Sequence, residues 1–344
     1  MTRVALDLLG GDHAPVAVVD GALLATSEVP GLEVVLVGPP EVAERLLAKR
    51  GTAGALPVVP ASQVVGMHED AARAVRSKRD ATVRVAARLV RDGAAEAMVS
   101  VGSTGAALAA AVFTLGRLRG VSRPALAALV PAQAGPLVLL DAGAGVDATP
   151  DLLAQFALAG AALARVRLGL PSPRVGLLTI GEEAGKGDQL RREAHALLAE
   201  LPIDYVGSVQ GSDVPYGGLA DVVVTDGFTG NVLAKGLEGA AAMLTGALRT
   251  AFSATPERAA ASALLPALDQ VTADMSPDDF GGGVLLGVKG VCVVGHGASS
   301  PRAVASCVKV AAQAADEGLV PKVAADLSDL LDRRRAAATS GTQA

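Results

Sequence analysis

Aromatic residues are nearly absent from this chain of 344 residues, at 2% of the sequence and with no Trp. Proteins that bind single-stranded nucleic acid stack bases on aromatic side chains, and this chain has few such platforms. Its formal net charge of -5 also lacks the basic excess that binding to a phosphate backbone requires. No nucleic-acid partner is therefore expected, and the core must consist largely of Ala, Val and Leu.

Cysteine and histidine are also scarce. The two cysteines, Cys292 and Cys307, are too few for a disulfide framework or a four-ligand metal site, and their apolar neighbours predict that both are buried. The histidines show neither the H-x-x-x-H nor the H-E-x-x-H spacing of zinc sites. They are His13, His68, His195 and His296. The sequence therefore gives no support for a zinc site.

No long uncharged run is suited to crossing a membrane. The opening MTRVALDLLGGD contains two acids and lacks the basic and apolar regions of a signal peptide. The run 124–140 is interrupted by Pro131, Gly135 and Pro136 and is too short to span a bilayer. A cytoplasmic protein is therefore expected.

Short apolar segments alternate with Ala-rich segments of helical periodicity, which is typical of an α/β fold. The apolar segments are continuous runs, as in parallel strands buried on both faces. Segments 126–130 and 137–140 are joined by a short Pro/Gly turn, which favours a hairpin and hence a mixed, mostly parallel sheet. The other expected strands are 4–8, 33–37, 97–101, 175–180, 205–209, 222–225 and 291–294. The expected helices include 16–27, 82–91, 106–117, 151–166, 188–200 and 232–248.

The chain contains no linker-like tract, repeat or low-complexity block, so residues 1–335 are expected to form a single large α/β catalytic domain. Pro256 and Pro266 interrupt an Ala/Leu-rich stretch, which predicts a pair of short helices projecting over 255–275. The small polar residues of 336–344 predict a disordered tail.

Five glycine-rich loops follow predicted strands, at 10–13, 102–105, 181–188, 226–231 and 295–300. Loops at the carboxyl ends of strands bind ligands in open α/β sheets, and helix N-termini there attract anions. Glycine is a common turn residue, so one such loop alone carries little weight, but five together indicate a phosphate-handling site. The predicted binding residues are Gly10, Gly11, Asp12, Ser103, Thr104, Gly105, Gly181, Gly187, Asp226, Gly230, His296 and Ser299.

The nucleotide-binding motifs are missing from these loops. Residues 181–187 are one residue too short for the P-loop pattern G-x-x-x-x-G-K-[ST], and Gly187 stands where Ser or Thr would bind magnesium. Neither a G-x-G-x-x-G fingerprint after the first strand nor a G-x-S-x-G nucleophile elbow occurs. The pattern therefore favours phosphate as a substrate rather than as part of a nucleotide.

The loops carry a further, ordered set of motifs. The chain reads LGGDHAP at 9–15, SVGSTGA at 100–106, RPALA at 123–127 and LDAGA at 140–144. It continues with VGLLTIGEEAGKG at 175–187, DVVVTDGFTGNV at 221–232 and GHGASS at 295–300. In this order, these motifs resemble those of the phosphate acyltransferases of bacterial phospholipid synthesis, from residue 1 to about 310.

The resemblance implies a reversible reaction in which acyl-(acyl carrier protein) and inorganic phosphate give acyl phosphate and free carrier protein. It also implies a three-layer α/β/α sandwich like that of isopropylmalate dehydrogenase and the phosphotransacetylases, in a homodimer without cofactor or metal. Three positions depart from the family pattern. Ser103 and Gly145 each stand where Asn is usual, and Ser212 stands where Arg is common.

Phosphate is already an anionic nucleophile, so catalysis requires positioning and stabilisation of an oxyanion. Lys186, between two glycines, is predicted to stabilise this charge, with a solvated loop lysine as the alternative. Asn231 is predicted to donate its amide to an oxygen or to cap a helix, and Asp226 to orient Lys186 or to cap a turn. His13 is predicted to donate a proton or bind phosphate, or else to hold its loop.

The segment 69–92 is rich in arginine and is predicted to receive the acidic carrier protein. The docking residues are Arg73, Arg76, Lys78 and Arg79, and a solvated helix face with ion pairs is the alternative. The Ala/Leu-rich stretch 259–271 is predicted to line an acyl groove, touch the membrane peripherally or form a dimer interface. Two other functions stay open, namely a phosphotransacetylase-like enzyme acting on a small acyl-CoA and a non-catalytic acyl-binding scaffold at the membrane.

Overall fold

The computed structural model describes residues 2–341 except 182, 184, 255–262 and 275–276. Its centre is an eleven-stranded sheet. In spatial order, the strands are β3 (Val58–Pro60), β2 (Leu32–Gly38), β1 (Thr2–Asp7), β4 (Ala97–Ser100), β11 (Val291–Val294), β10 (Gly283–Leu286), β5 (Ala125–Val130), β6 (Leu137–Leu140), β9 (Val222–Val224), β7 (Arg174–Thr179) and β8 (Asp204–Gln210).

The sheet is mixed, as the sequence predicts, and its two halves run in opposite directions. Strands β3, β2, β1, β4 and β11 are mutually parallel, and so are β6, β9, β7 and β8. Between these blocks, β10 is antiparallel to β11 and β5, and β5 forms the predicted antiparallel hairpin with β6. The carboxyl ends of the two parallel blocks therefore lie at opposite edges of the sheet.

Two short strands, β3 and β10, are absent from the sequence-based expectations. Strand β10 begins directly after two glycines and contains only a short apolar run, so the sequence pattern does not mark it as a strand. A Cβ on Gly283 would lie 2.6 Å from Leu126 Cδ1, so the glycine at this position permits β5 to pack closely against β10.

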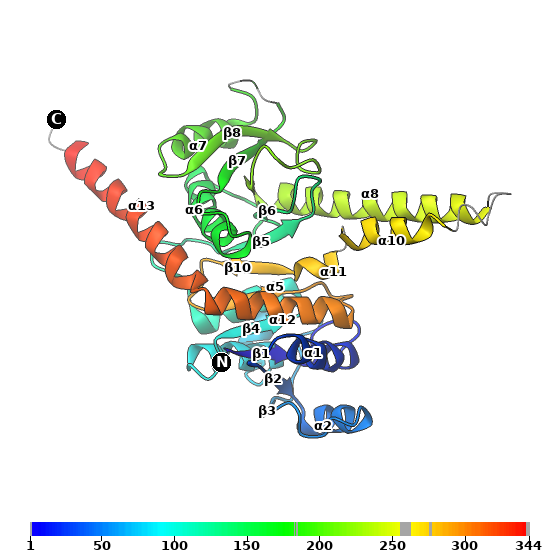
Figure 1. Ribbon diagram of the computed structural model, residues 1–344. Coiled ribbons are helices and arrows are strands. Elements are labelled where there is room, and N and C mark those ends of the chain that lie inside the picture. Colours follow the sequence, from blue (N-terminus) through cyan, green and yellow to red (C-terminus); the bar gives the residue numbers. More distant parts are fainter. Residues whose placement is uncertain (1, 182, 184, 255–262, 275–276, 342–344) are drawn as a thin grey trace.

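Helices cover both faces of the sheet and make the expected α/β sandwich (Figure 1). One face packs against α1 (Val16–Glu28), α2 (Pro40–Lys49), α6 (Pro150–Arg167), α7 (Gln189–Ala199), α12 (Pro301–Asp316) and the start of α13 (Leu319–Gly341). The other face packs against α3 (Ala71–Ser77), α4 (Thr82–Arg91), α5 (Thr104–Ala110) and its π-helical continuation Ala111–Leu115 in one half. In the other half, α8 (Gly227–Ala254) covers this face.

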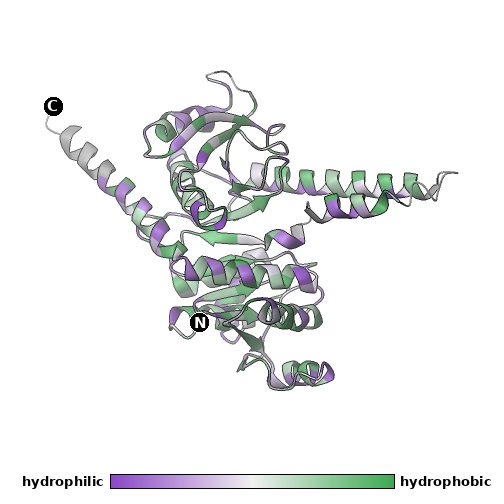
Figure 2. Ribbon diagram, in the orientation of Figure 1, coloured by the Kyte–Doolittle hydropathy of each residue, from purple (hydrophilic) through white to green (hydrophobic). Residues whose placement is uncertain are grey.

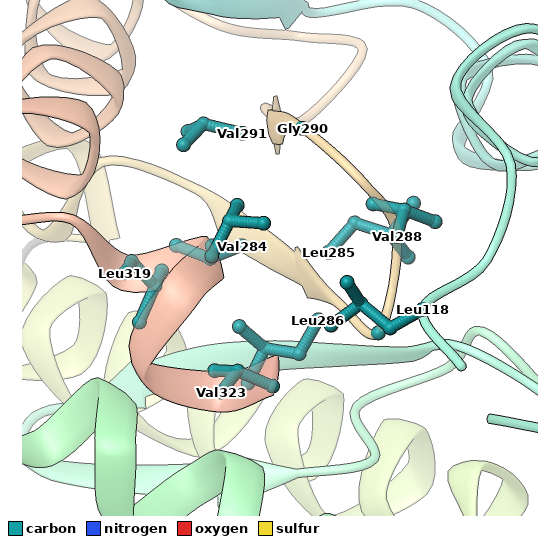
Figure 3. A pocket seen from close by; sticks show the side chains of 11 residues that line it. Leu118, Val284, Leu285, Leu286, Val288, Gly290, Val291, Leu319 and Val323 are labelled. Atoms are coloured by element: carbon teal, nitrogen blue, oxygen red, sulfur yellow. The ribbon is translucent and has the colours of Figure 1, made fainter. Parts of the chain in front are cut away.

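The core consists of Ala, Val and Leu, and both Cys292 and Cys307 are buried in it as predicted. Burial raises the pKa of each thiol to about 12, so neither is a reactive thiolate. A small apolar cavity of about 10 Å³ lies between β10 and the start of α13, beside Val284, Leu319 and Val323 (Figure 3). It has room for about one water molecule, so it is a packing gap rather than a substrate site.

A helical arm leaves the body of the protein. Helix α8 continues well past the sheet, and α10 (Leu265–Asp274) lies beside its distal part, joined by an ion pair between Arg249 and Asp269 (Figure 1). Of the pair of short helices predicted over 255–275, the described residues show α10, which packs against the long helix α8, and 255–262 and 275 lie outside the described residues. A short helix, α11 (Pro277–Phe280), leads back to β10.

The C-terminal segment differs from its expectation. Helix α13 continues to Gly341, so residues 336–341 are helical rather than disordered, and 342–344 lie outside the described residues. The run of three alanines at 336–338 favours this continuation because alanine has the highest helix propensity. No helix in the described ranges is both long and apolar enough to cross a membrane.

Candidate active site

The first group of predicted residues lies at the carboxyl ends of the adjacent parallel strands β1, β4 and β11. The Asp12 N–H donates to the Gly297 oxygen over 2.7 Å, which joins the loop after β1 to the loop after β11. A Cβ on Gly10 would lie 2.9 Å from the Gly102 nitrogen, so glycine is needed for this close approach. We call this the β1-side group. Its members are Gly10, Gly11, Asp12, His13, Ser103, Thr104, Gly105, His296 and Ser299.

A buried carboxylate that was not predicted from the sequence, that of Asp7, holds the loops of the β1-side group in place. Asp7 Oδ2 accepts the Ser100 hydroxyl over 2.7 Å, and Asp7 Oδ1 accepts the Leu9 N–H over 3.2 Å. Burial raises the pKa of Asp7, against the lowering effect of hydrogen bonds from Thr82 and Ser100. These contacts fix the start of the Gly10–Gly11 turn. The sequence signal was an acid inside an apolar strand.

Two serines of the β1-side group use their hydroxyl groups within their own loops. Ser103 Oγ caps α5 by accepting the Ala106 N–H over 3.4 Å. Ser299 Oγ donates to the His296 oxygen over 2.5 Å. An N-cap oxygen still has its own hydrogen to donate, so Ser103 can bind a further acceptor, whereas the hydrogen of Ser299 is already engaged.

The second group of predicted residues lies at the carboxyl ends of β9 and β7. We call it the β9-side group, and its members are Gly181, Lys186, Gly187, Asp226, Gly230 and Asn231. Asn231 is the fifth residue of α8, so its side chain does not cap this helix. Its Nδ2 donates to the Ala142 oxygen in the loop after β6, over 3.1 Å. The amide has a second N–H, which donates to no group in the part of the chain that the structure describes and can therefore bind a ligand.

Asp226 contacts Thr229 and Arg191. Its Oδ1 accepts the Thr229 N–H over 2.9 Å at the start of α8, and its Oδ2 pairs with the guanidinium of Arg191. Arg191 also pairs with Asp188, over 2.9 Å, before the start of α7. Burial by itself would raise the pKa of Asp226, but the bonds from Thr229 and Arg191 outweigh it and hold the pKa below its ordinary value. Arg191 thus joins the loop after β7 to α8, a role that no sequence pattern indicated.

Lys186 lies on an exposed loop. Gly185 and Gly187 flank it with φ values of 89° and 97°, which other residues rarely adopt. Its side chain is 51% exposed, and its Nζ lies 3.9 Å from a Glu183 oxygen. A contact of this length between exposed groups neutralises the ammonium only weakly.

The loop after β6 packs against the start of α8. Asp141, at the beginning of this loop, is buried and accepts backbone N–H groups from Leu126, Gly143, Ala144 and Gly145 over 2.8–3.0 Å. Burial raises the pKa of Asp141, in opposition to these four bonds. Asp141 belongs to the motif at 140–144, but no role for its side chain was predicted from the sequence.

The structure does not bring all five glycine-rich loops together. The β1-side group and the β9-side group follow strands of opposite direction, so they lie at opposite edges of the sheet. His13 is therefore separated from Lys186 and Asn231. On the face covered by α5 and α8, the β5 side chains Leu126 and Ala128 between the two helices are only partly buried.

The predicted docking residues lie on and just after α3. Arg73, Arg76 and Arg79 are exposed, whereas Lys78 pairs with Glu69 and donates to the Val64 oxygen over 2.8 Å. The Arg76 guanidinium lies 4.4 Å from the ring centre of Phe113, on the π-helical continuation of α5. Helix α3 is packed against α5, since a Cβ on Gly105 would lie 3.1 Å from Ala71 Cβ.

Comparison with solved structures defines the class of the fold. A phosphotransacetylase from Streptococcus pyogenes matches 92% of this chain and 94% of its own at a TM-score of 0.63, with 19% sequence identity. A branched-chain phosphotransacylase from Enterococcus faecalis V583 matches 92% of this chain and 99% of its own at a TM-score of 0.59, with 18% identity. The protein therefore has the α/β fold of the phosphotransacetylases, as the resemblance implied.

The family follows from sequence. The model of the fatty acid synthesis protein family matches residues 2–322, and the chain belongs to this family. A phosphate acyltransferase from Myxococcus xanthus is 47% identical over 322 residues, covering 92% of this chain and 91% of the relative. A phosphate acyltransferase from Desulfitobacterium hafniense is 40% identical over 328 residues, covering 95% and 98%. These relationships confirm the family predicted from the motifs.

Proposed function

We propose that this chain transfers a long acyl group from acyl carrier protein to inorganic phosphate, forming an acyl phosphate for phospholipid synthesis. A phosphate oxygen attacks the thioester carbonyl carbon and forms a C–O bond. The C–S bond then breaks, and sulfur leaves with the electron pair as a thiolate. The full-length relation to proteins named phosphate acyltransferase supports this reaction.

The β9-side group is the better candidate for the chemical step. The observation that carries this assignment is an exposed lysine, Lys186, on a loop that Arg191 ties to the first turn of the 28-residue helix α8. A cation and a helix N-terminus both stabilise negative charge, as on phosphate and on the tetrahedral oxyanion. The free N–H of Asn231 adds a donor on the same helix.

The β1-side group is assigned to binding the acyl donor. It includes the start of α5, and α5 packs directly on α3, where the exposed arginines lie. A carrier protein bound at α3 would then lie beside this group. Its prosthetic arm would follow the partly exposed β5 surface, between α5 and α8, toward Lys186. In this arrangement, His13 contacts the donor rather than the phosphate.

The helical arm is proposed to form a homodimer. Hydrophobic residues follow one another along the ribbon of the arm (Figure 2). Among the exposed ones on α8 and α10 are Met243 at 72%, Leu244 at 59% and Val271 at 56%. Exposed apolar surface of this extent marks an interaction site. The protein is proposed to lie in the cytoplasm. The end of the same arm is proposed to contact the inner face of the membrane peripherally. Residues 255–262 lie outside the described residues. Vesicle pelleting of the protein with and without 255–275 tests this contact.

The reaction is tested by incubating the purified protein with palmitoyl-(acyl carrier protein) and phosphate and detecting acyl phosphate by mass spectrometry. Product that requires both phosphate and enzyme is the expected result. Product from acetyl-CoA alone would support the small acyl-CoA alternative. Binding of the acyl donor without any product would support the scaffold.

A further inference from the structure

The loop after β6 resembles an anion-binding cradle, but its donors are already occupied. The N–H groups of Gly143, Ala144 and Gly145 all point to the carboxylate of Asp141, over 2.9, 2.8 and 2.9 Å. A phosphate cannot use these donors without displacing a buried carboxylate from them. Any anion held beside this loop must therefore use donors other than these three N–H groups.

The cations near this loop differ in how far they are neutralised. Arg191 lies between two carboxylates, those of Asp188 and Asp226, and is nearly buried. Arg123, which precedes β5, is exposed and has no carboxylate within ion-pair distance among the described residues. Its one described bond runs from Nη1 to the Asp147 backbone oxygen, over 2.8 Å. A guanidinium has five N–H donors, so most of those on Arg123 are available.

The glycine at position 145 makes room for this arginine. A Cβ on Gly145 would lie 2.9 Å from Arg123 Cδ and 3.2 Å from its Nη1, so any larger residue would force the side chain to shift. Asn231 contacts the same loop at Gly143, two residues before Gly145. A Cβ on Gly143 would lie 2.8 Å from Asn231 Nδ2. Arg123 and Asn231 thus contact the same short loop.

We propose that Arg123 is a phosphate-binding residue of this site, and that Gly145 positions it by leaving space across the loop. The inference deepens the proposed function, on which it rests, by naming a second cation besides Lys186. It also gives a physical meaning to the departure at position 145. Where this chain has glycine, Arg123 lies in the space that a side chain at position 145 would take.

The test compares Arg123→Gln, Arg123→Lys and Gly145→Asn with the parent, using the exposed Arg119→Gln as a matched control. Loss of a charged hydrogen-bond donor predicts a KM for phosphate raised roughly tenfold or more in Arg123→Gln, with a smaller change in kcat. Arg123→Lys should recover part of the loss because it keeps the charge. Gly145→Asn should raise the KM for phosphate in the parent background but have little further effect in Arg123→Gln.

An unchanged KM for phosphate in Arg123→Gln, with activity retained, would overturn the proposal. So would equal and additive effects of Gly145→Asn in both backgrounds, since they would mean that position 145 does not act through the arginine. If the parent forms no acyl phosphate, the proposed function fails independently. Phosphorus NMR titration of inorganic phosphate then decides the inference, which requires weaker binding to Arg123→Gln than to the parent and to Arg119→Gln.

Discussion

At the residue scale, the charge of Lys186 is the feature of the β9-side group most directly open to test. Replacing Lys186 with alanine should lower kcat/KM for acyl phosphate formation roughly tenfold to a hundredfold, because a charged donor to the phosphate or oxyanion is lost. Stability should change little, since the side chain is exposed and its contact with Glu183 is long. Steady-state kinetics and thermal unfolding measure the two effects separately.

The matched control for Lys186 is Lys309→Ala, which removes a lysine of α12 that is paired with Glu28 of α1 and belongs to neither loop group. It should leave kcat/KM unchanged. Equal activity of the two variants would show that Lys186 is only a solvated loop residue.

Also at the residue scale, Asp226 should make folding stability depend on pH. Its hydrogen bonds hold its pKa below the ordinary 3.8. A depressed carboxyl pKa contributes stability that is full above the unfolded-state pKa and is lost as the pH falls through the folded-state pKa. Between about pH 7 and about pH 3, the parent should therefore lose more unfolding free energy than Asp226→Asn.

Urea denaturation at several pH values measures this difference. The exposed Asp329→Asn serves as the control and should follow the parent. Identical pH profiles for the parent and Asp226→Asn would contradict the role of Thr229 and Arg191 in stabilising the charged carboxylate.

At the scale of elements, α3 is expected to select the carrier protein. Charge reversal at Arg76 and Arg79 should raise the KM for palmitoyl-(acyl carrier protein) roughly tenfold, because exposed complementary charges set encounter and orientation. Turnover of a palmitoyl thioester that lacks the protein part should be unaffected. A loss with both donors would instead indicate that the contact of Arg76 with Phe113 is needed to maintain α5.

The α8–α10 arm leads to a second prediction at this scale. Met243 and Leu244 are more than half exposed, so replacing both with lysine removes little packing within one chain. The unfolding free energy of the monomer should therefore change by less than about 1 kcal/mol. Sedimentation velocity should show the dimer dissociating, whereas Val64→Lys, an exposed position away from the arm, should not alter it. A monomeric parent would remove the basis for the homodimer proposal.

At the scale of the whole molecule, the two ends of the chain build one half of the sheet together. Strands β1 and β4 come from the first hundred residues and pair with each other, and β11, from near residue 290, pairs with β4, while α12 packs against β1 and β4. The middle of the chain builds the other half. Nothing in the local sequence indicated that a strand from near the end of the chain joins strands from its beginning. The sequence of β11 is like that of any other buried strand, and its pairing with β4 depends on contacts between distant segments.

Local sequence was sufficient to identify the α/β class, the hairpin of β5 and β6, the buried cysteines and the family. These properties depend on apolar runs, short turns and ordered motifs, and each of these involves residues that are close together in the sequence. The same reasoning placed the glycine-rich loops at strand ends. It could not find Arg191 or Asp7, since each acquires its role from a partner far away in the sequence. Asp141 was missed although three of its four donors lie within four residues of it, because its burial and its bond to the Leu126 N–H appear only in the folded chain.

Which loops lie at the same edge of the sheet was decided only by the tertiary structure. Inserting β10 and β5 between two parallel blocks reverses the direction of the second block, which puts Lys186 and Asn231 at the edge opposite His13. The sequence determined the chemistry that each loop carries, through its glycines, hydroxyls and cations. Strand direction depends on hydrogen bonding between distant segments, and it determined at which edge of the sheet each of those groups lies.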